Sequence, residues 1–385
     1  MKNTLKARTE RFQTRLADNN IDVAVLTDED SISWLAGFWG YLGIEFGRPS
    51  MMLVPKDGDP IVITPLMESD MVKAMTWVED VRSWEDPRGA SHWDEILSSA
   101  LGGNNAKTIG LEKLKTPALI SAHLDTSHSA AKFADVSAIL SDMRMIKSAE
   151  EIEIMRQAGQ IAIAMLEGGR SALGEGVPEY EVALAIINAG TRKAAGFLTD
   201  SGLDAFISPT VHNLQVLQSG ADTAMVHRRS SVKTLKRGDP VYMCFCGMVN
   251  FRQYKLGFDR EYFIGSCTDE EAKTYEVCIA AQKAALDAVR PGAIAEHVHE
   301  AANEVYRSAG FSPGYRTGRA IGISNLESPE LKTGDRSVLQ AGMTFAVDGG
   351  ITVPGKYGAR VGDSIVVTED GFEFFTPYPK ELSIV

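Results

Sequence analysis

The sequence predicts an α+β protein of two domains, a smaller α/β domain over residues 1–142 and a larger domain over residues 143–385. The first observation is length, because 385 residues exceed what one ordinary hydrophobic core usually organises. The second is the N-terminal third, where short β-branched runs alternate with helical stretches. The third is the remainder, where long helical patterns alternate with extended segments, as in helices packed on an antiparallel sheet.

The predicted smaller domain alternates strands and helices. We expect strands at 21–27 and 108–112, and a hairpin over 49–65 whose turn is formed by Asp57 and Gly58. The chain opens on a charged amphipathic helix without the apolar stretch of a signal peptide. No apolar run approaches the length that a membrane helix needs. These features predict a cytoplasmic protein that does not bind a membrane.

The predicted larger domain begins with a helix whose start is marked by a capping box. Ser148 stands three residues before Glu151, and apolar residues then recur at helical spacing. Further helices are expected at 178–195, 269–289 and 295–309. In the last of these, His297 and His299 do not share a helix face, so we expect both to be solvated rather than to form a metal site.

Composition and charge exclude some classes of function. A net charge of −12 and a pI near 5.2 argue against the basic surface that nucleic acid requires. The hydrophobic content of 44% and charged content of 23% are ordinary for a globular protein. The spacing of the cysteines fits no zinc pattern, so free, buried thiols are the simplest interpretation. These cysteines are Cys244, Cys246, Cys267 and Cys278.

Five stretches of the larger domain carry a family resemblance through their order and spacing. They are KSAEEIEIMRQAG; LQSGADTAMVH; LKRGDPVYMCFCG with DREYFIG; RTGRAIGIS; and VLQAGMTFAVDGGITVPGKYGARVGDSIVVTEDG. Together they resemble the superfamily of prolidase, aminopeptidase P, methionine aminopeptidase and creatinase. The resemblance implies a pita-bread fold for residues 143–385 and a creatinase-type N-terminal domain for residues 1–142. The chain looks nearest to the metal-free members, creatinase and ectoine hydrolase.

The resemblance also bears on metal binding. The peptidases of this superfamily hold two metal ions with two Asp, one His and two Glu. Matched to this sequence, those positions are occupied by Cys244 or Cys246, Gly257, Arg319, Asp348 and Gly362. One carboxylate of five is left, and a hard two-metal site needs several anionic oxygens. We therefore expect neither a metal nor another cofactor.

His227 matches a histidine that the superfamily keeps seven residues after the QSG motif. In creatinase that histidine carries the proton in a metal-free hydrolysis. An unperturbed imidazole pKa of about 6.5 suits proton transfer near neutral pH. The resemblance therefore implies a catalytic His227. The alternative is a surface loop residue beside two arginines.

Four further residues match substrate-binding positions of creatinase. Phe46 and Arg48 resemble a segment that reaches into the neighbouring subunit's active site, which implies a homodimer; the alternative is a core aromatic beside a solvated charge. Asp259 and Asp348 match the two glutamates that hold creatinase's guanidinium group, although Asp259 could instead form a surface ion pair. Arg319 would add positive charge to the cavity, for a substrate carboxylate or an oxyanion.

These matches predict a metal-independent hydrolase of a C–N bond other than a peptide bond. The substrate would be an amidine, guanidine, urea or amide of a small amino-acid-like compound, as for creatinase, an amidinohydrolase. Three alternatives stay open: an inactive member that binds a ligand or partner, an Xaa-Pro peptidase-like enzyme, and a lyase. Within the main prediction water is the nucleophile, and Cys244 or Cys246, activated by His227, is a weaker candidate.

Overall fold

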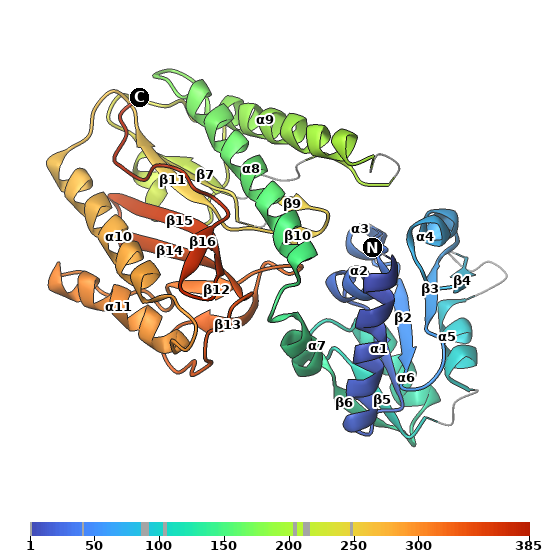
Figure 1. The fold of residues 1–385 in the computed structure, drawn as a ribbon. Helices are drawn as coiled ribbons and strands as arrows, with labels where there is room; N and C mark the ends of the chain where they lie inside the picture. The colour runs from blue at the N-terminus through green and yellow to red at the C-terminus, as the bar shows by residue number, and fades with distance from the viewer. Residues whose placement is uncertain are drawn as a thin grey trace. The chain divides into compact units, whose positions relative to one another are not determined.

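The computed structural model describes residues 2–40, 42–85, 92–102, 106–202, 206–210, 216–246 and 249–385. The chain separates into two compact units, Met1–Met143 and Arg144–Val385, each with its own sheet (Figure 1). The first is α/β and the second packs long helices on an antiparallel sheet, so the predicted α+β class is confirmed. No helix among the described residues is long and apolar enough to cross a membrane.

The smaller unit is built on a six-stranded sheet in the order β4-β3-β2-β1-β5-β6. The predicted hairpin is confirmed, because β2 and β3 pair antiparallel and Gly58 between them has φ +103°, which suits glycine. The strands are β1 (Val23–Leu26), β2 (Met51–Pro55), β3 (Ile61–Pro65), β4 (Asp80–Trp84), β5 (Thr108–Leu111) and β6 (Lys132–Asp135). The helices are α1 (Lys2–Asp18), α2 (Glu29–Ala36), α3 (Leu42–Phe46), α4 (Ser69–Met75), α5 (Trp93–Gly102), α6 (Ala118–Ser127) and α7 (Ser137–Arg144).

The larger unit is built on an antiparallel sheet in the order β13-β12-β14-β15-β11-β8-β7, with β16 also paired to β15. The strands are β7 (Val216–Ser219), β8 (Pro240–Cys244), β11 (Asp259–Phe263), β12 (Gly318–Ala320), β13 (Glu327–Leu331), β14 (Thr344–Val353), β15 (Tyr357–Val367) and β16 (Phe372–Phe374). A small separate pair is formed by β9 (Asn250–Phe251) and β10 (Tyr254–Lys255). The helices are α8 (Ala149–Ala172), α9 (Glu179–Asp200), α10 (Asp269–Ala288) and α11 (Ala295–Ser308).

The start of α8 follows the predicted capping box. The Ser148 side chain accepts a hydrogen bond from the Glu151 amide at 3.3 Å, and the Glu151 carboxylate accepts one from the Ser148 amide at 2.8 Å. Both interactions satisfy amides that the first helical turn leaves without partners.

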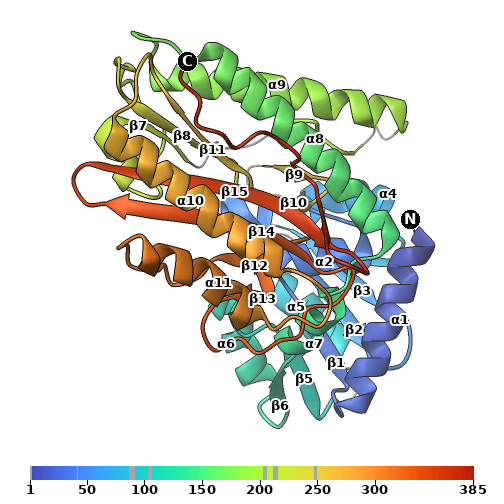
Figure 2. The ribbon, with the colours of Figure 1, turned by 60° about the vertical axis from the view of Figure 1, so that its left-hand side comes forward.

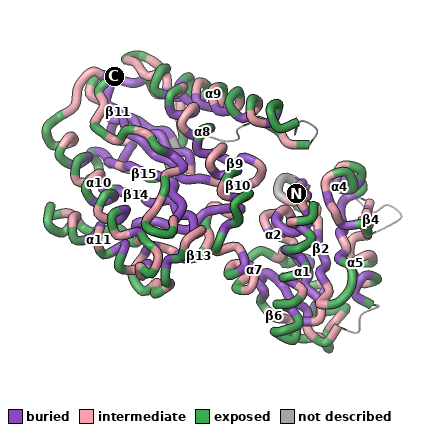
Figure 3. Tube along the Cα trace, viewed as in Figure 1, coloured by how far each residue is buried: buried purple, intermediate pink, exposed green. Residues whose placement is uncertain are grey.

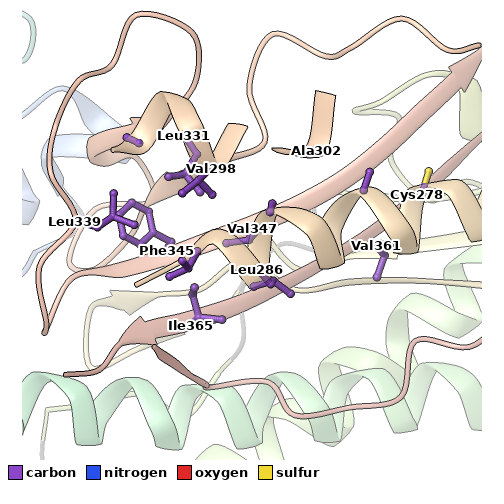
Figure 4. Close-up of a cluster of buried hydrophobic side chains, with 14 of the residues drawn as sticks. Cys278, Leu286, Val298, Ala302, Leu331, Leu339, Phe345, Val347, Val361 and Ile365 are labelled. Carbon is purple, nitrogen blue, oxygen red and sulfur yellow. The ribbon is translucent and has the colours of Figure 1, made fainter. Parts of the chain in front are cut away.

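Helices cover one face of the larger sheet. Val347, Val361 and Ile365 of the sheet share one hydrophobic cluster with Cys278 and Leu286 of α10 (Figure 4). Burying each large aliphatic side chain of such a cluster contributes about 1.5–3 kcal/mol. Figure 2 shows α10 lying across β14 and β15. These strands consist largely of buried residues, drawn in purple in Figure 3. Because side chains alternate along a strand, the residues between these point to the opposite face.

Candidate functional site

A row of residues crosses four strands on the face of the sheet opposite to α10. Asp348 pairs with Gly362, Gly362 with Asp259, and Asp259 with Cys244. Residues that pair directly across an antiparallel sheet project from the same face. The row therefore gathers two carboxylates and a thiol that lie far apart in the sequence.

Gly362 makes room for the two carboxylates to converge. A Cβ atom at this position would stand 2.7 Å from an oxygen of Asp259 and 2.7 Å from Oδ1 of Asp348. Any other residue would have to displace both carboxylates, because Cβ contacts of this length are repulsive. Gly362, which the resemblance matches to a metal-ligand position, thus shapes the site although it offers no donor.

Arg319 supplies the positive charge of the site from the neighbouring strand β12. It is buried, and its Nη1 donates to Oδ2 of Asp348 at 3.1 Å. Its Nε donates to the carbonyl oxygen of Asn325 at 3.0 Å, which orients the guanidinium plane. Nη2 lies 3.3 Å from the point where a Gly257 Cβ would stand, so Gly257 provides the space for this side chain.

Asp348 is only partly neutralised by this arginine. Its Oδ1 is buried and has no hydrogen-bond partner among the described residues. Burial raises the pKa of Asp348 to about 6, with Arg319 opposing the shift and Asp259 adding to it. A buried carboxylate oxygen without a partner costs about 1–3 kcal/mol or more. Such an atom is suited to accept a hydrogen bond from a ligand, or to carry a proton.

Two thiols complete the site. Cys244 ends β8, and Cys246 lies in the turn that follows, with its Sγ 3.7 Å from Oδ1 of Asp259. The donor atoms of Cys244, Cys246 and Asp259 all lie within 4.8 Å of one another. A hydrogen bond with Cys246, burial and the nearby Asp259 raise the pKa of the Cys244 thiol well above its usual value.

The remaining predicted residues lie elsewhere in their units. His227 is exposed in a turn after the short helix Gly220–Ala224, and within the described residues its imidazole makes no hydrogen bond. The turn is anchored by Arg228, which donates to the buried Glu179 at 3.0 Å. In the smaller unit Phe46 is 60% exposed, and the Arg48 guanidinium carbon lies 5.5 Å from its ring centre. The roles of these residues stay predictions.

Two supporting residues were missed or misjudged from sequence. His299, expected to be solvated, is buried on α11, and its Nδ1 lies 2.7 Å from Oγ1 of Thr317. The carbonyl of Thr317 accepts a hydrogen bond from the Asp348 amide at 2.7 Å. Ser364 donates to the Gly257 carbonyl at 2.6 Å and accepts from its amide at 3.0 Å. The helical pattern left His299 on an unclear face, and neither partner is near in sequence.

The side chains present do not fit a pair of hard metal ions. The matched positions converge in space, as the close approaches around Gly257 and Gly362 show. Both glycines lack a side-chain donor, and Arg319 places a guanidinium against Asp348. A pair of divalent ions bound through oxygens needs several carboxylates and no cation among them. Cys244, Cys246 and Asp259 are what the described residues offer as a compact donor group.

Comparison with known families matches both units. The model of metallopeptidase family M24 matches residues 153–369. The model of the creatinase/prolidase N-terminal domain matches residues 8–146. The predicted superfamily resemblance and pita-bread fold are thereby confirmed.

Individual relatives match over nearly the whole chain. The chain is 32% identical to an agropine synthesis cyclase of Rhizobium rhizogenes, over 97% of this chain and 96% of that protein. It is 29% identical to an Xaa-Pro dipeptidase of Lactobacillus helveticus, over 98% of each. Among solved structures, dipeptidase PepE from Mycobacterium ulcerans superposes with a TM-score of 0.80 at 27% identity, covering 100% of this chain and 98% of that one.

These relatives correct the functional prediction. The expected metal-independent, creatinase-like amidinohydrolase is wrong, because the matching relatives include Xaa-Pro dipeptidases and the family model is that of metallopeptidases. Hydrolysis as the general class of the family stands, but the assignment to C–N bonds other than peptide bonds does not. The match of Asp259 and Asp348 to guanidinium-binding glutamates does not specify a guanidinium substrate, because carboxylates also form charge-assisted hydrogen bonds with an ammonium group.

Proposed function

We propose, because this chain belongs to metallopeptidase family M24, that it is a dipeptidase-like hydrolase of small zwitterionic substrates, with Xaa-Pro dipeptides as the first class to test. The supporting relatives are Xaa-Pro dipeptidases aligned over 98% of both chains. The observation that carries the proposal is the opposed charge within one site, where Arg319 and Asp348 form an ion pair beside Asp259.

The charges of the site complement those of a dipeptide. A free dipeptide carries an ammonium group at one end and a carboxylate at the other. The buried Oδ1 of Asp348, together with Asp259, is suited to the ammonium group. The planar fork of Arg319 is suited to a carboxylate, which it can bind through two hydrogen bonds. In the free protein Arg319 and Asp348 form an ion pair, so a zwitterion that binds both replaces one pairing of opposite charges with two.

The direct experiment compares matched dipeptides. Purified protein is incubated with Gly-Pro, Ala-Pro and Leu-Pro and with the corresponding Xaa-Ala dipeptides, with a chelator or with added Zn²⁺, Co²⁺ or Mn²⁺, and the released amino acids are measured. We expect release of proline above that of alanine. Absence of release with every dipeptide and metal would overturn the proposal.

His227 has a separate test in the same assay. If it carries a proton, His227→Gln lowers kcat by about 10²–10⁴-fold. A surface residue would leave kcat unchanged, and because the side chain is exposed, neither outcome is confused by unfolding.

A second candidate function is ring closure, and the agropine synthesis cyclase at 32% identity favours it. Ring closure between an acyl group and a hydroxyl or amine is hydrolysis in reverse, so one site can serve both. Agropine itself is the test compound. Its ring opening adds one water, which mass spectrometry detects. Activity on agropine without proline release from Xaa-Pro dipeptides would favour this candidate over the first.

We further propose that the protein is a cytoplasmic homodimer in which Phe46 and Arg48 complete the partner's site. The support is the exposed Phe46 ring with its stacked Arg48, and four cysteines that are all free thiols. Light scattering gives the mass in solution. Mixing Arg48→Ala with Arg319→Ala subunits tests the sharing, because a mixed dimer regains one intact site. A monomer, or no recovery on mixing, contradicts this arrangement.

A further inference from the structure

We infer that Cys244, Cys246 and Asp259 form a binding site for one soft divalent cation, with Zn²⁺ as the type case. The site differs in ligands, number of ions and metal preference from a pair of ions bound through oxygens. It does not depend on which substrate the protein takes, because binding of the cation is measured without one.

The three donors are placed by the sheet rather than by a sequence motif. Cys244 and Asp259 are direct partners on β8 and β11, and both are buried. Cys246 follows in the turn after β8, and its Sγ comes within 3.7 Å of the Asp259 carboxylate. All three donor atoms lie within 4.8 Å of one another, so a cation bound at about 2.0–2.3 Å from each fits with small side-chain adjustments.

The donor types select the metal. Thiolates prefer soft or borderline ions such as Zn²⁺, whereas Mg²⁺, Ca²⁺ and Mn²⁺ prefer oxygen ligands. Three protein ligands with the fourth position open are the usual arrangement of a catalytic zinc ion. Asp259 adds a carboxylate oxygen to the two thiols, and Zn²⁺ accepts sulfur and oxygen ligands in one site.

The neighbouring charges allow one cation and disfavour two. Arg319 lies on the Cys246 side of the site, where a Gly257 Cβ would stand 3.3 Å from Nη2 and 3.4 Å from the Cys246 sulfur. Its guanidinium charge offsets the anionic ligands and occupies space that a second ion would need. Asp348 stands on the other side of Gly362 and balances Arg319.

Binding is expected to release protons from the thiols. Thiols bind metal ions as thiolates, so a protonated Cys244 or Cys246 must lose its proton on binding. A cation must displace that proton, so affinity falls as the pH falls. Among the described residues, the titratable or charged groups that the strand register places on this face include Asp348, Arg319, Glu330, Arg360, Glu261 and Tyr242.

Cobalt titration of the metal-free protein tests the site. The full chain is stripped with a chelator, and Co²⁺ is added while thiolate-to-cobalt charge-transfer absorption is recorded. We expect the band to saturate at one equivalent and to disappear when Zn²⁺ displaces Co²⁺. Cys244→Ser, Cys246→Ser and Asp259→Asn should each weaken binding at least 10-fold, and each serine variant should lose part of the band. Cys267→Ser is the matched control and should behave as the parent.

The outcomes are decisive in either direction. No charge-transfer band in the folded parent, or a band unchanged in both Cys244→Ser and Cys246→Ser, overturns the site. If a variant does not fold, the parent protein alone still tests the site. Bound Zn²⁺ should protect Cys246 from alkylation by iodoacetamide, which mass spectrometry measures. Equal alkylation with and without Zn²⁺ contradicts the proposal. Since no substrate is involved, failure of the dipeptide assay leaves this result unaffected.

Discussion

The two faces of the larger sheet differ in how fully their buried carboxylates are paired. On the helix-covered face Asp363 is fully buried and paired with both Arg260 and Lys380 at 2.8 Å, with further hydrogen bonds from Gln282 and Thr376. On the other face Asp348 keeps a buried oxygen without a partner among the described residues. A saturated carboxylate stabilises the fold, whereas one that retains an open hydrogen-bonding position is available for a ligand.

The same contrast appears between adjacent residues of β11. Arg260 donates to the carbonyls of Asp259, Gly362, Tyr378 and Pro379 as well as to Asp363. It thereby holds β11, β15 and the C-terminal segment together. Asp259, one residue earlier, points the other way, toward Cys246 and Asp348. Strand alternation thus separates a structural charge network from the candidate site by a single residue.

The largest expected effect comes from breaking the structural network. Asp363→Asn leaves the Arg260 guanidinium buried without its counter-charge, so the free energy of unfolding should fall by about 3–5 kcal/mol. Asp348→Asn, the matched change on the other face, should leave it equal or slightly higher. Denaturant unfolding measures both. Equal losses in the two variants would show that the faces do not differ as described.

The second largest effect is expected from removing Arg319, which lies on the face of the sheet opposite to α10. Arg319→Ala removes a charged hydrogen-bonding group of about 1.5–3 kcal/mol, which corresponds to a 10- to 100-fold fall in kcat/KM. Arg319→Lys keeps the charge but not the planar fork, and should recover only part of the activity. Steady-state kinetics on the preferred substrate measures both. Unchanged kinetics in Arg319→Ala would remove this residue from substrate binding.

The third effect is a pH dependence centred on Asp348. Because burial raises its pKa to about 6, above the ordinary value of 3.8, the folded state favours the protonated form. Its contribution to stability is therefore present below about pH 4 and is lost as the pH rises through about 6. Asp348→Asn should match the parent at pH 4 and exceed it in stability at pH 8. Melting temperatures of the parent and the variant at pH 4 and pH 8 measure this. The same difference between the two proteins at both pH values would contradict it.

Local signals in the sequence predicted the elements, and tertiary pairing determined the site. The capping box at Ser148 and the turn at Gly58 depend on neighbouring residues, so their patterns are readable. The row from Asp348 to Cys244 depends on the register of four strands that are distant in sequence, which no local pattern specifies. The proposed donor group of Cys244, Cys246 and Asp259 could not be predicted from the sequence for the same reason. Asp259 comes close to the two cysteines only because β11 pairs with β8.

The smallest expected effect concerns Thr317, which links the backbone of Asp348 to the side chain of His299. Thr317 accepts the Asp348 amide through its carbonyl and contacts the buried His299 through its hydroxyl at 2.7 Å. Thr317→Val keeps the shape and the backbone bond but removes the hydroxyl, so the free energy of unfolding should fall by about 1–3 kcal/mol. Thr317→Ser restores the hydroxyl and should recover most of this loss. If Thr317 positions Asp348, kcat falls a few-fold in the valine variant while KM is unchanged, and the serine variant restores it. A loss of stability with no change in kcat would show that Thr317 stabilises the fold but does not position Asp348.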